Sequence, residues 1–321
     1  MYDKILELYR AAEFADGLEL ASVLSSKAAL LRLGTDEDML EAQTLLKQAY
    51  GIYNTYLGPR HIETAHAQLH LALTHFDMDE YIDARPLFSA CLDVFREVAG
   101  SRVGMASLRG HFARRGARVG LSSAAGSGVT GSSEADAAMY IPDVLNCLGS
   151  MTHAEGDSKG ARALYTEALR QYMDLYGEIH PDVAKVLNNF AALMDDNNEV
   201  KEAQELYEHS LHVLQQYYGR NHVSVAVAME NLGNLIVAHS GTDGDEKSGA
   251  LEQGRMLLET AADIRDELAE IELVDVHPAE EEEVAPPDDF LLDFISGVSD
   301  SVGAGAGRGD DDPLGTGCVV M

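Results

Sequence analysis

Hydrophobic residues recur along most of this chain with the three- and four-residue spacing of amphipathic helices. One such block contains Leu187, Phe190 and Met194, the next contains Leu206, and the Asp-Asn-Asn run at residues 196–198 lies between them. Asp and Asn are typical turn residues. The pattern therefore predicts a helical hairpin in this region.

The hairpin pattern repeats along the sequence. Identical residues lie 42 positions apart in five pairs: Ala42 and Ala84, Ala161 and Ala203, Gly177 and Gly219, His180 and His222, and Asn189 and Asn231. Recurrence at a fixed period is the signature of a repeat array. We predict an all-α fold, an α-solenoid in the form of a right-handed superhelix with about five helical hairpins and small residues where two helices touch.

The spacing of small and large residues resembles the tetratricopeptide repeat, in which Gly or Ala at the eighth position, Ala at the twentieth and an aromatic residue at the twenty-fourth allow close helix packing. The repeat of 42 residues, with Leu187-Asn188-Asn189-Phe190-Ala191, Lys201-Glu202-Ala203 and Tyr218-Gly219-Arg220-Asn221-His222, is similar to the longer repeats of kinesin light chains and nephrocystin-like proteins. HEAT-type repeats have a similar length but do not require this set. Only about twenty residues precede the first repeat, too few for the heptad region of kinesin light chains.

The departures from the period divide the chain into six segments. These are an N-terminal capping helix at 1–19, repeats 1 and 2 at 20–100, a disordered Gly/Ser/Arg-rich insert at 101–138, repeats 3 to 5 at 139–273, a disordered acidic tether at 274–317 and a lipidation box at 318–321. The insert is either an electrostatic partner of the acidic tether or a loop without a role. Residues 240–249 are expected to lengthen the turn of the fifth hairpin.

Charge and composition limit the classes of partner. The chain has 54 acidic and 23 basic residues, for a net charge of -31, which argues against nucleic acid as a partner. Three cysteines are too few for a disulfide framework, and no apolar run reaches the roughly 18 residues of a membrane span. We expect a cytoplasmic protein without a secretory signal.

The last four residues, Cys318-Val319-Val320-Met321, match a C-a-a-X box, on which a prenyltransferase attaches an isoprenoid, with Met favouring farnesyl. The alternative is a terminus that has a cysteine there by chance. The box predicts lipidation of Cys318 and weak, reversible membrane association or transport by a prenyl-binding carrier, because a single lipid chain anchors only marginally.

The acidic tether also contains an apolar segment at residues 288–295, Asp-Asp-Phe-Leu-Leu-Asp-Phe-Ile. Apolar residues alternating with acids are typical of short docking peptides. The segment is expected to dock on a partner or on the groove of its own chain, or to form a local helix against the last repeat.

The strongest candidates for chemistry are four histidines, His61, His66, His70 and His75. His66 and His70 share a helix face, as metal ligands do. No HExxH motif accompanies them and no carboxylate is fixed at a matching distance, so most are expected to be exposed or to line a groove. We predict no metal site, no cofactor and no enzyme activity.

Recognition of a protein is the better interpretation. In tetratricopeptide arrays the first helix of each hairpin lines the concave groove, and the positions expected to be exposed there are Asp143, Asn146, Ser150, Lys185, Asn188, Val227, Glu230 and Asn234. Asparagine amides can bind the backbone of an extended peptide. The resemblance to kinesin light chains implies the same role for Asn188, Asn189 and Asn231, although Asn189 and Asn231 could instead satisfy backbone carbonyls between hairpins.

Two functions fit these features. In the first, the chain is a prenyl-anchored interaction scaffold that holds a partner's peptide in its groove. In the second, it is a soluble regulatory subunit whose groove is occupied by residues 288–295 until a partner displaces them.

Overall fold

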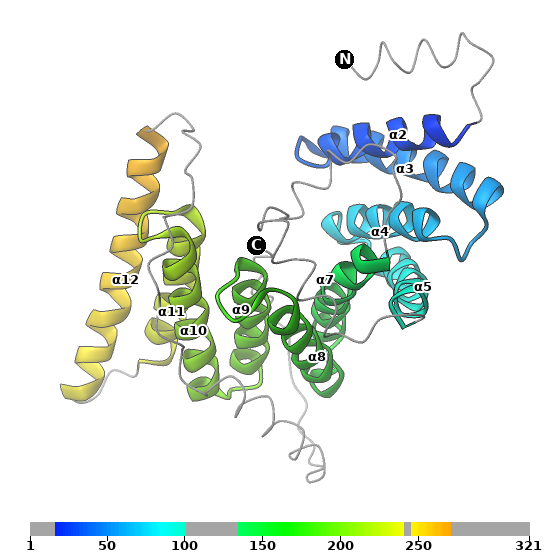
Figure 1. Cartoon of the computed structure of the whole chain (residues 1–321). Helices are drawn as coiled ribbons and strands as arrows, with labels where there is room; N and C mark the ends of the chain where they lie inside the picture. The colour runs from blue at the N-terminus through cyan, green and yellow to red at the C-terminus, as the bar shows by residue number, and fades with distance from the viewer. Residues whose placement is uncertain (1–16, 101–133, 241–244, 271–321) are drawn as a thin grey trace. The chain divides into compact units, whose positions relative to one another are not determined.

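The computed structural model describes residues 17–100, 134–240 and 245–270, and these residues form ten α-helices and no strand. The helices follow one another as antiparallel pairs (Figure 1). The five hairpins are α2 (Leu18–Leu31) with α3 (Asp36–Leu57), α4 (Ile62–Asp77) with α5 (Tyr81–Gly100), α7 (Glu134–Ala154) with α8 (Ser158–Tyr176), α9 (Pro181–Asp196) with α10 (Val200–Tyr218), and α11 (Val223–His239) with α12 (Asp245–Glu270). The predicted all-α repeat fold is confirmed.

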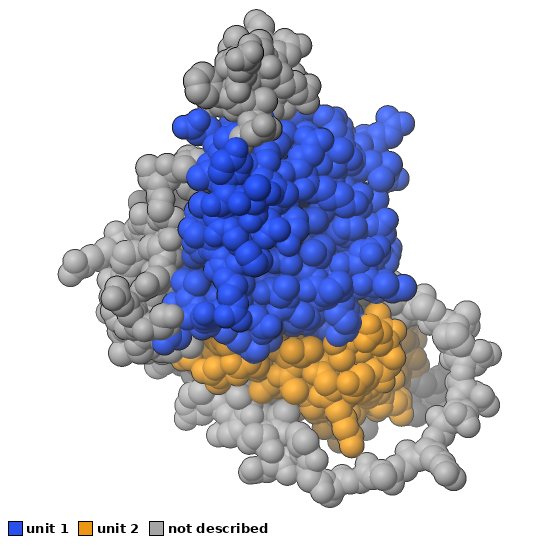
Figure 2. All heavy atoms as spheres, turned by 90° about the vertical axis from the view of Figure 1, so that its right-hand side faces the viewer, with its two compact units in different colours: residues 1–151 blue, residues 152–321 orange. Residues whose placement is uncertain are grey.

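The chain divides into two compact units, Met1–Met151 and Thr152–Met321 (Figure 2). The division falls inside α7, three residues before that helix ends. Unit 1 contains the first two hairpins and most of α7. Unit 2 contains α8 to α12.

The small residues of the repeat pattern are fully buried. Ala84, Ala161 and Ala203 are all 0% exposed. In the last hairpin, a Cβ added to Gly233 of α11 would lie 3.0 Å from the carbonyl oxygen of Gly254 on α12. Two backbones can approach this closely only where a side chain is missing. In this last hairpin, small residues mark the contact between the two helices, as predicted.

The recurring Gly and His of the sequence build the turn from one hairpin to the next. Gly177 and Gly219 follow the last residues of α8 and α10 and have φ of +85° and +81°, which favours glycine. Three residues later, His180 and His222 are the N-caps of α9 and α11, and each ring Nδ1 accepts a hydrogen bond from the backbone N–H two residues on. The 42-residue recurrence thus marks a helix stop followed by a helix start.

Two boundaries of the sequence prediction are wrong. Helix α7 begins at Glu134, inside the range assigned to the insert, because Ala137 and Ala138 are buried and extend its apolar face. Helix α12 begins at Asp245, so the turn of the fifth hairpin is shorter than residues 240–249.

Several predictions concern residues outside the described ranges. They include most of the N-terminal capping helix, residues 101–133 of the insert, the acidic tether with residues 288–295, and Cys318. These remain predictions from the sequence.

Candidate peptide-binding face

The first helices of the last two hairpins, α9 and α11, carry polar residues on one face. Lys185 and Asn188 lie one turn apart on α9, and Val227, Asn231 and Asn234 occupy successive turns of α11. We call these five residues the A-helix face of unit 2. All five belong to the same compact unit.

A direct hydrogen bond joins the two helices in this face. Asn231 Nδ2 donates to Asn188 Oδ1 at 2.7 Å. The bond links residues 43 apart in sequence, one position more than the repeat length, so it runs diagonally from one hairpin to the next. From the sequence alone, Asn231 could also satisfy a backbone carbonyl. In this contact, however, Asn231 donates to the side-chain amide oxygen of Asn188.

Two asparagines that the sequence predicts to be exposed are buried. Asn188 is 4% exposed and Asn146 is 3% exposed, whereas Asn234 is exposed as predicted. Helical register predicts an exposed Asn188, but the side chain of Asn231 on the first helix of the next hairpin, α11, contacts it. Asn189, one position further around α9, is 1% exposed.

The three charged residues of the predicted peptide site, Asp143, Lys185 and Glu230, have different surroundings. Glu230 is engaged by Arg265 of α12, with 2.5 Å between Oε2 and Nη2. Lys185 is half-buried, one turn after Asp182. Burial raises the pKa of the Asp182 carboxyl, and the positive charge of Lys185 opposes that rise. Asp143 is half-buried and belongs to unit 1 with Asn146, so the predicted residues fall in both units.

Two histidine–aspartate contacts also join neighbouring first helices, and the sequence analysis does not predict them. His153 Nε2 of α7 lies 2.7 Å from Asp196 Oδ2, and His239 Nε2 of α11 lies 2.7 Å from Asp195 Oδ1. The last turn of α9 thus contacts one histidine from the first helix of the preceding hairpin and one from the first helix of the following hairpin. The sequence signal for them is a His–Asp separation of 43 or 44 residues, close to the repeat length.

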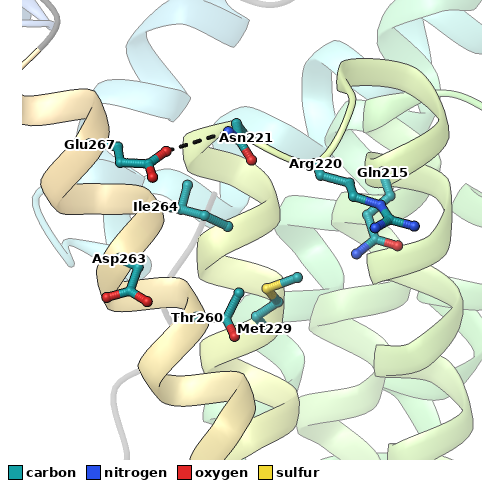
Figure 3. A pocket seen from close by; sticks show the side chains of 8 residues that line it. All are labelled: Gln215, Arg220, Asn221, Met229, Thr260, Asp263, Ile264 and Glu267. Carbon is teal, nitrogen blue, oxygen red and sulfur yellow. Dashed lines mark hydrogen bonds between the residues drawn. The ribbon is translucent and has the colours of Figure 1, made fainter.

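Unit 2 also has an open pocket on another part of its surface, between α10, α11 and α12 (Figure 3). Met229 and Ile264 form its apolar part, and Asn221 contacts Glu267 at its rim at 3.4 Å. The lining residues are Gln215, Arg220, Asn221, Met229, Thr260, Asp263, Ile264 and Glu267. None of the predicted site residues lines this pocket.

The histidines of α4 do not behave as one group. His61 is the N-cap of α4 and accepts from the backbone N–H of Glu63 at 3.2 Å. Burial lowers the pKa of His70 to about 3, with smaller contributions from Arg32 and His66. His75 is 6% exposed and its Nδ1 lies 2.6 Å from Glu80 Oε2. Of the four histidines, His61 is exposed and His75 is buried. The expectation that no carboxylate is fixed at a matching distance is wrong for His75.

Comparison with known proteins agrees with this geometry. The chain is a helical-hairpin repeat protein, and residues 28–97 and 140–212 match the sequence model of the tetratricopeptide repeat. The first matched segment lies in unit 1, and the second begins in unit 1 and lies mostly in unit 2. Among curated proteins no sequence matches the chain.

Two solved structures show the same fold. The crystal structure of BtubC (BKLC) from P. vanneervenii has a TM-score of 0.57 and 16% identity, covering 90% of this chain and 95% of that one. The crystal structure of a single-residue variant of a Podosopora anserina protein, described as a putative kinesin light chain with nearly identical TPR-like repeats, has a TM-score of 0.51 and 17% identity, covering 79% of this chain and 99% of that one. Among the described residues, no helix combines the length and apolar character needed to cross a bilayer.

Proposed function

We propose that the A-helix face of unit 2 binds the backbone of an extended peptide from a partner protein. Proteins with tetratricopeptide repeats generally act as protein-interaction scaffolds and are typically not enzymes. The observation that supports this site within the repeats is the amide pair of Asn188 and Asn231.

The pair leaves hydrogen-bonding groups available. Asn188 Oδ1 and one hydrogen of Asn231 Nδ2 are used in their mutual bond, and across the described residues no protein acceptor pairs with Asn188 Nδ2 and no donor with Asn231 Oδ1. An amide in a residue only 4% exposed is costly to leave without a partner. A peptide backbone offers the complementary C=O and N–H at each residue, whatever its side chains.

The charged neighbours favour an acidic side chain on that peptide. Lys185 lies one turn before Asn188 on the same face. Glu230 is already neutralised by Arg265 and adds little discrimination against acidic residues.

The double variant Asn188→Ala, Asn231→Ala tests the site. Affinity capture with the full chain, followed by quantitative mass spectrometry, identifies the partners, and peptides mapped from them are titrated by fluorescence anisotropy. We expect the double variant to weaken binding by about 1–3 kcal/mol, because the peptide loses its hydrogen-bonding groups.

A matched control separates binding from folding. Gln204→Ala removes an amide that contacts Glu208 on α10, outside the A-helix face, and is expected to leave affinity unchanged. Circular dichroism must show the same helix content in all variants. Partners retained equally by the double variant would place the site elsewhere on the chain.

The membrane part of the proposal depends on Cys318 alone. We propose that it is farnesylated and that the attachment is reversible, because Asp310, Asp311 and Asp312 precede it and an anionic leaflet repels them. Cell fractionation is expected to divide the protein between membrane and cytosol and to find Cys318→Ser only in the cytosol. An unmodified C-terminal peptide from cells with active prenyltransferase would contradict lipidation.

A further inference from the structure

We propose that the turn between α4 and α5 binds a divalent transition-metal ion, with Zn²⁺ as the expected species, through His75, Glu80 and Asp83. This site lies in unit 1 and is independent of the A-helix face. One ligand atom from each of the three residues lies within 4.8 Å of the other two.

The backbone of the turn holds these residues together. Asp79 has φ of 59°, and the N–H of Glu80 donates to the carbonyl oxygen of His75 at 2.8 Å, so the chain curls back on the end of α4. Glu80 Oε2 then lies 2.6 Å from His75 Nδ1. Asp83 follows three residues later in the first turn of α5, on the same side as Glu80.

The spacing fits a zinc ion after a small adjustment. Zinc bonds of about 2.0–2.2 Å in a tetrahedral arrangement place neighbouring ligand atoms about 3.3 Å apart. The His75–Glu80 contact, now 2.6 Å, must open by about 0.7 Å, and the ion replaces the proton between the two atoms. The His75 side chain is 7% exposed and stays fixed, whereas the Glu80 side chain is 39% exposed and can rotate. The fourth position would be open to water, as in zinc sites with three protein ligands.

A further contact orients one of the ligands. Gln43 of α3 donates from Nε2 to Glu80 Oε2 at 3.0 Å, and its Oε1 accepts from Lys47 at 2.9 Å. A carboxylate oxygen has lone pairs for both an amide donor and a metal ion. The same Nε2 also lies 3.4 Å from His75 Nδ1. Gln43 therefore contacts both ligand atoms, and it must move away from His75 when the ion binds while it keeps its bond to Glu80, as outer partners of zinc ligands do.

The ligand set selects the kind of ion. An imidazole nitrogen suits zinc and other first-row transition metals, whereas calcium and magnesium prefer ligand sets made of oxygen alone. Two carboxylates balance the charge of a dication. Asp79 adds negative charge close by, and Asp77 is paired with Arg32.

Titration of the full chain with Zn²⁺ in isothermal calorimetry, after removal of bound metal with a chelator, tests the site. We expect Zn²⁺ binding to saturate at one site. Glu80→Gln and Asp83→Asn should each lower the Zn²⁺ affinity by more than about tenfold, because loss of an outer partner alone costs roughly tenfold. Glu80→Gln keeps an acceptor for the His75 N–H, so this variant is expected to fold. Zn²⁺ should raise the melting temperature of the unmodified chain and not that of the Glu80→Gln variant.

The matched control is Asp79→Asn. Like Glu80→Gln, this variant removes one negative charge from the turn between α4 and α5, but it leaves all three proposed ligands in place. Asn tolerates the positive φ of this position. Its Zn²⁺ affinity is expected to stay within a factor of about three, since a nearby exposed charge contributes under about 1 kcal/mol. Titration with Co²⁺ adds a spectroscopic measurement, in which strong visible absorption indicates four-coordinate binding.

Three results would each overturn the proposal. The first is the absence of a saturable Zn²⁺ site. The second is an equal loss of affinity in Glu80→Gln, Asp83→Asn and Asp79→Asn, which would mean diffuse attraction to an acidic turn. The third is Ca²⁺ competing with Zn²⁺ at equal concentration, which would mean that the His75 nitrogen is not a ligand.

Discussion

Replacing Phe190 by alanine is expected to lower the free energy of unfolding by about 3–5 kcal/mol, the usual cost of removing a buried aromatic ring. Phe190 is 0% exposed. Its ring centroid lies 5.8 Å from that of Tyr165 on α8, and the guanidinium carbon of Arg162 lies 5.9 Å from it. The ring therefore joins α9 to the preceding hairpin as well as filling its own.

Chemical denaturation followed by circular dichroism measures this effect. The control is Met256→Ala, which truncates a large apolar side chain of the same unit that is 60% exposed, and its expected change is within about 0.5 kcal/mol. Each hairpin buries its faces only against its neighbours, so the loss at Phe190 should spread to the adjacent repeats. A loss below about 1 kcal/mol would mean that α8 and α9 do not pack through this ring.

The repeat fold could be predicted because its packing is periodic. A helix contact needs a small residue at a fixed distance from the hairpin turn, and that requirement is visible at Ala84, Ala161 and Ala203 without any structure. The Gly–His turn is equally visible at Gly177 and His180 because a left-handed C-cap and an N-cap both restrict residue type.

The candidate site was only partly predictable. Helical register gives the direction of a side chain from its own helix axis, but it does not show what a helix 43 residues away places over it. For this reason the sequence predicts an exposed Asn188, which is instead paired with Asn231. Similarly, the left-handed conformation of Asp79 recurs at Gly156 and Asn198, so the repeat predicts the turn but not the approach of the Glu80 side chain to His75 within it.

We also expect the stability of the chain to depend on pH, because the histidines that cap α9 and α11 at the turns between hairpins accept hydrogen bonds only when they are neutral. His180 Nδ1 accepts from the N–H of Asp182 at 3.2 Å, and the ring stacks on Tyr176 with 4.2 Å between centroids. A protonated Nδ1 cannot accept this bond. Burial lowers the pKa of His180 to about 4 and also lowers the pKa of His222, which stacks on Tyr218 in the same way.

The sign of the effect follows from these shifts. The unfolded chain protonates His180 near pH 6.5, whereas the folded chain resists protonation until about pH 4, so the unfolded state binds more protons in between. The stability from this group is complete above about pH 6.5 and is lost as the pH falls toward 4. A difference of about 2.5 pKa units corresponds to about 3 kcal/mol, and the side chain is only 12% exposed, so solvent screening is small.

The variant His180→Asn separates this group from the acid sensitivity of the remaining chain. Asparagine keeps a side-chain acceptor at the N-cap but does not titrate. Asp182 Oδ2, 3.4 Å from His180 Nδ1, is present in both proteins, so its raised pKa largely cancels in the comparison. Denaturation at a series of pH values should show the stability difference between the unmodified chain and the variant shifting by about 3 kcal/mol between pH 6.5 and 4, in favour of the variant. His222→Asn should shift it in the same direction. Parallel pH profiles for the unmodified chain and His180→Asn would show that His180 does not cap α9 as a neutral acceptor.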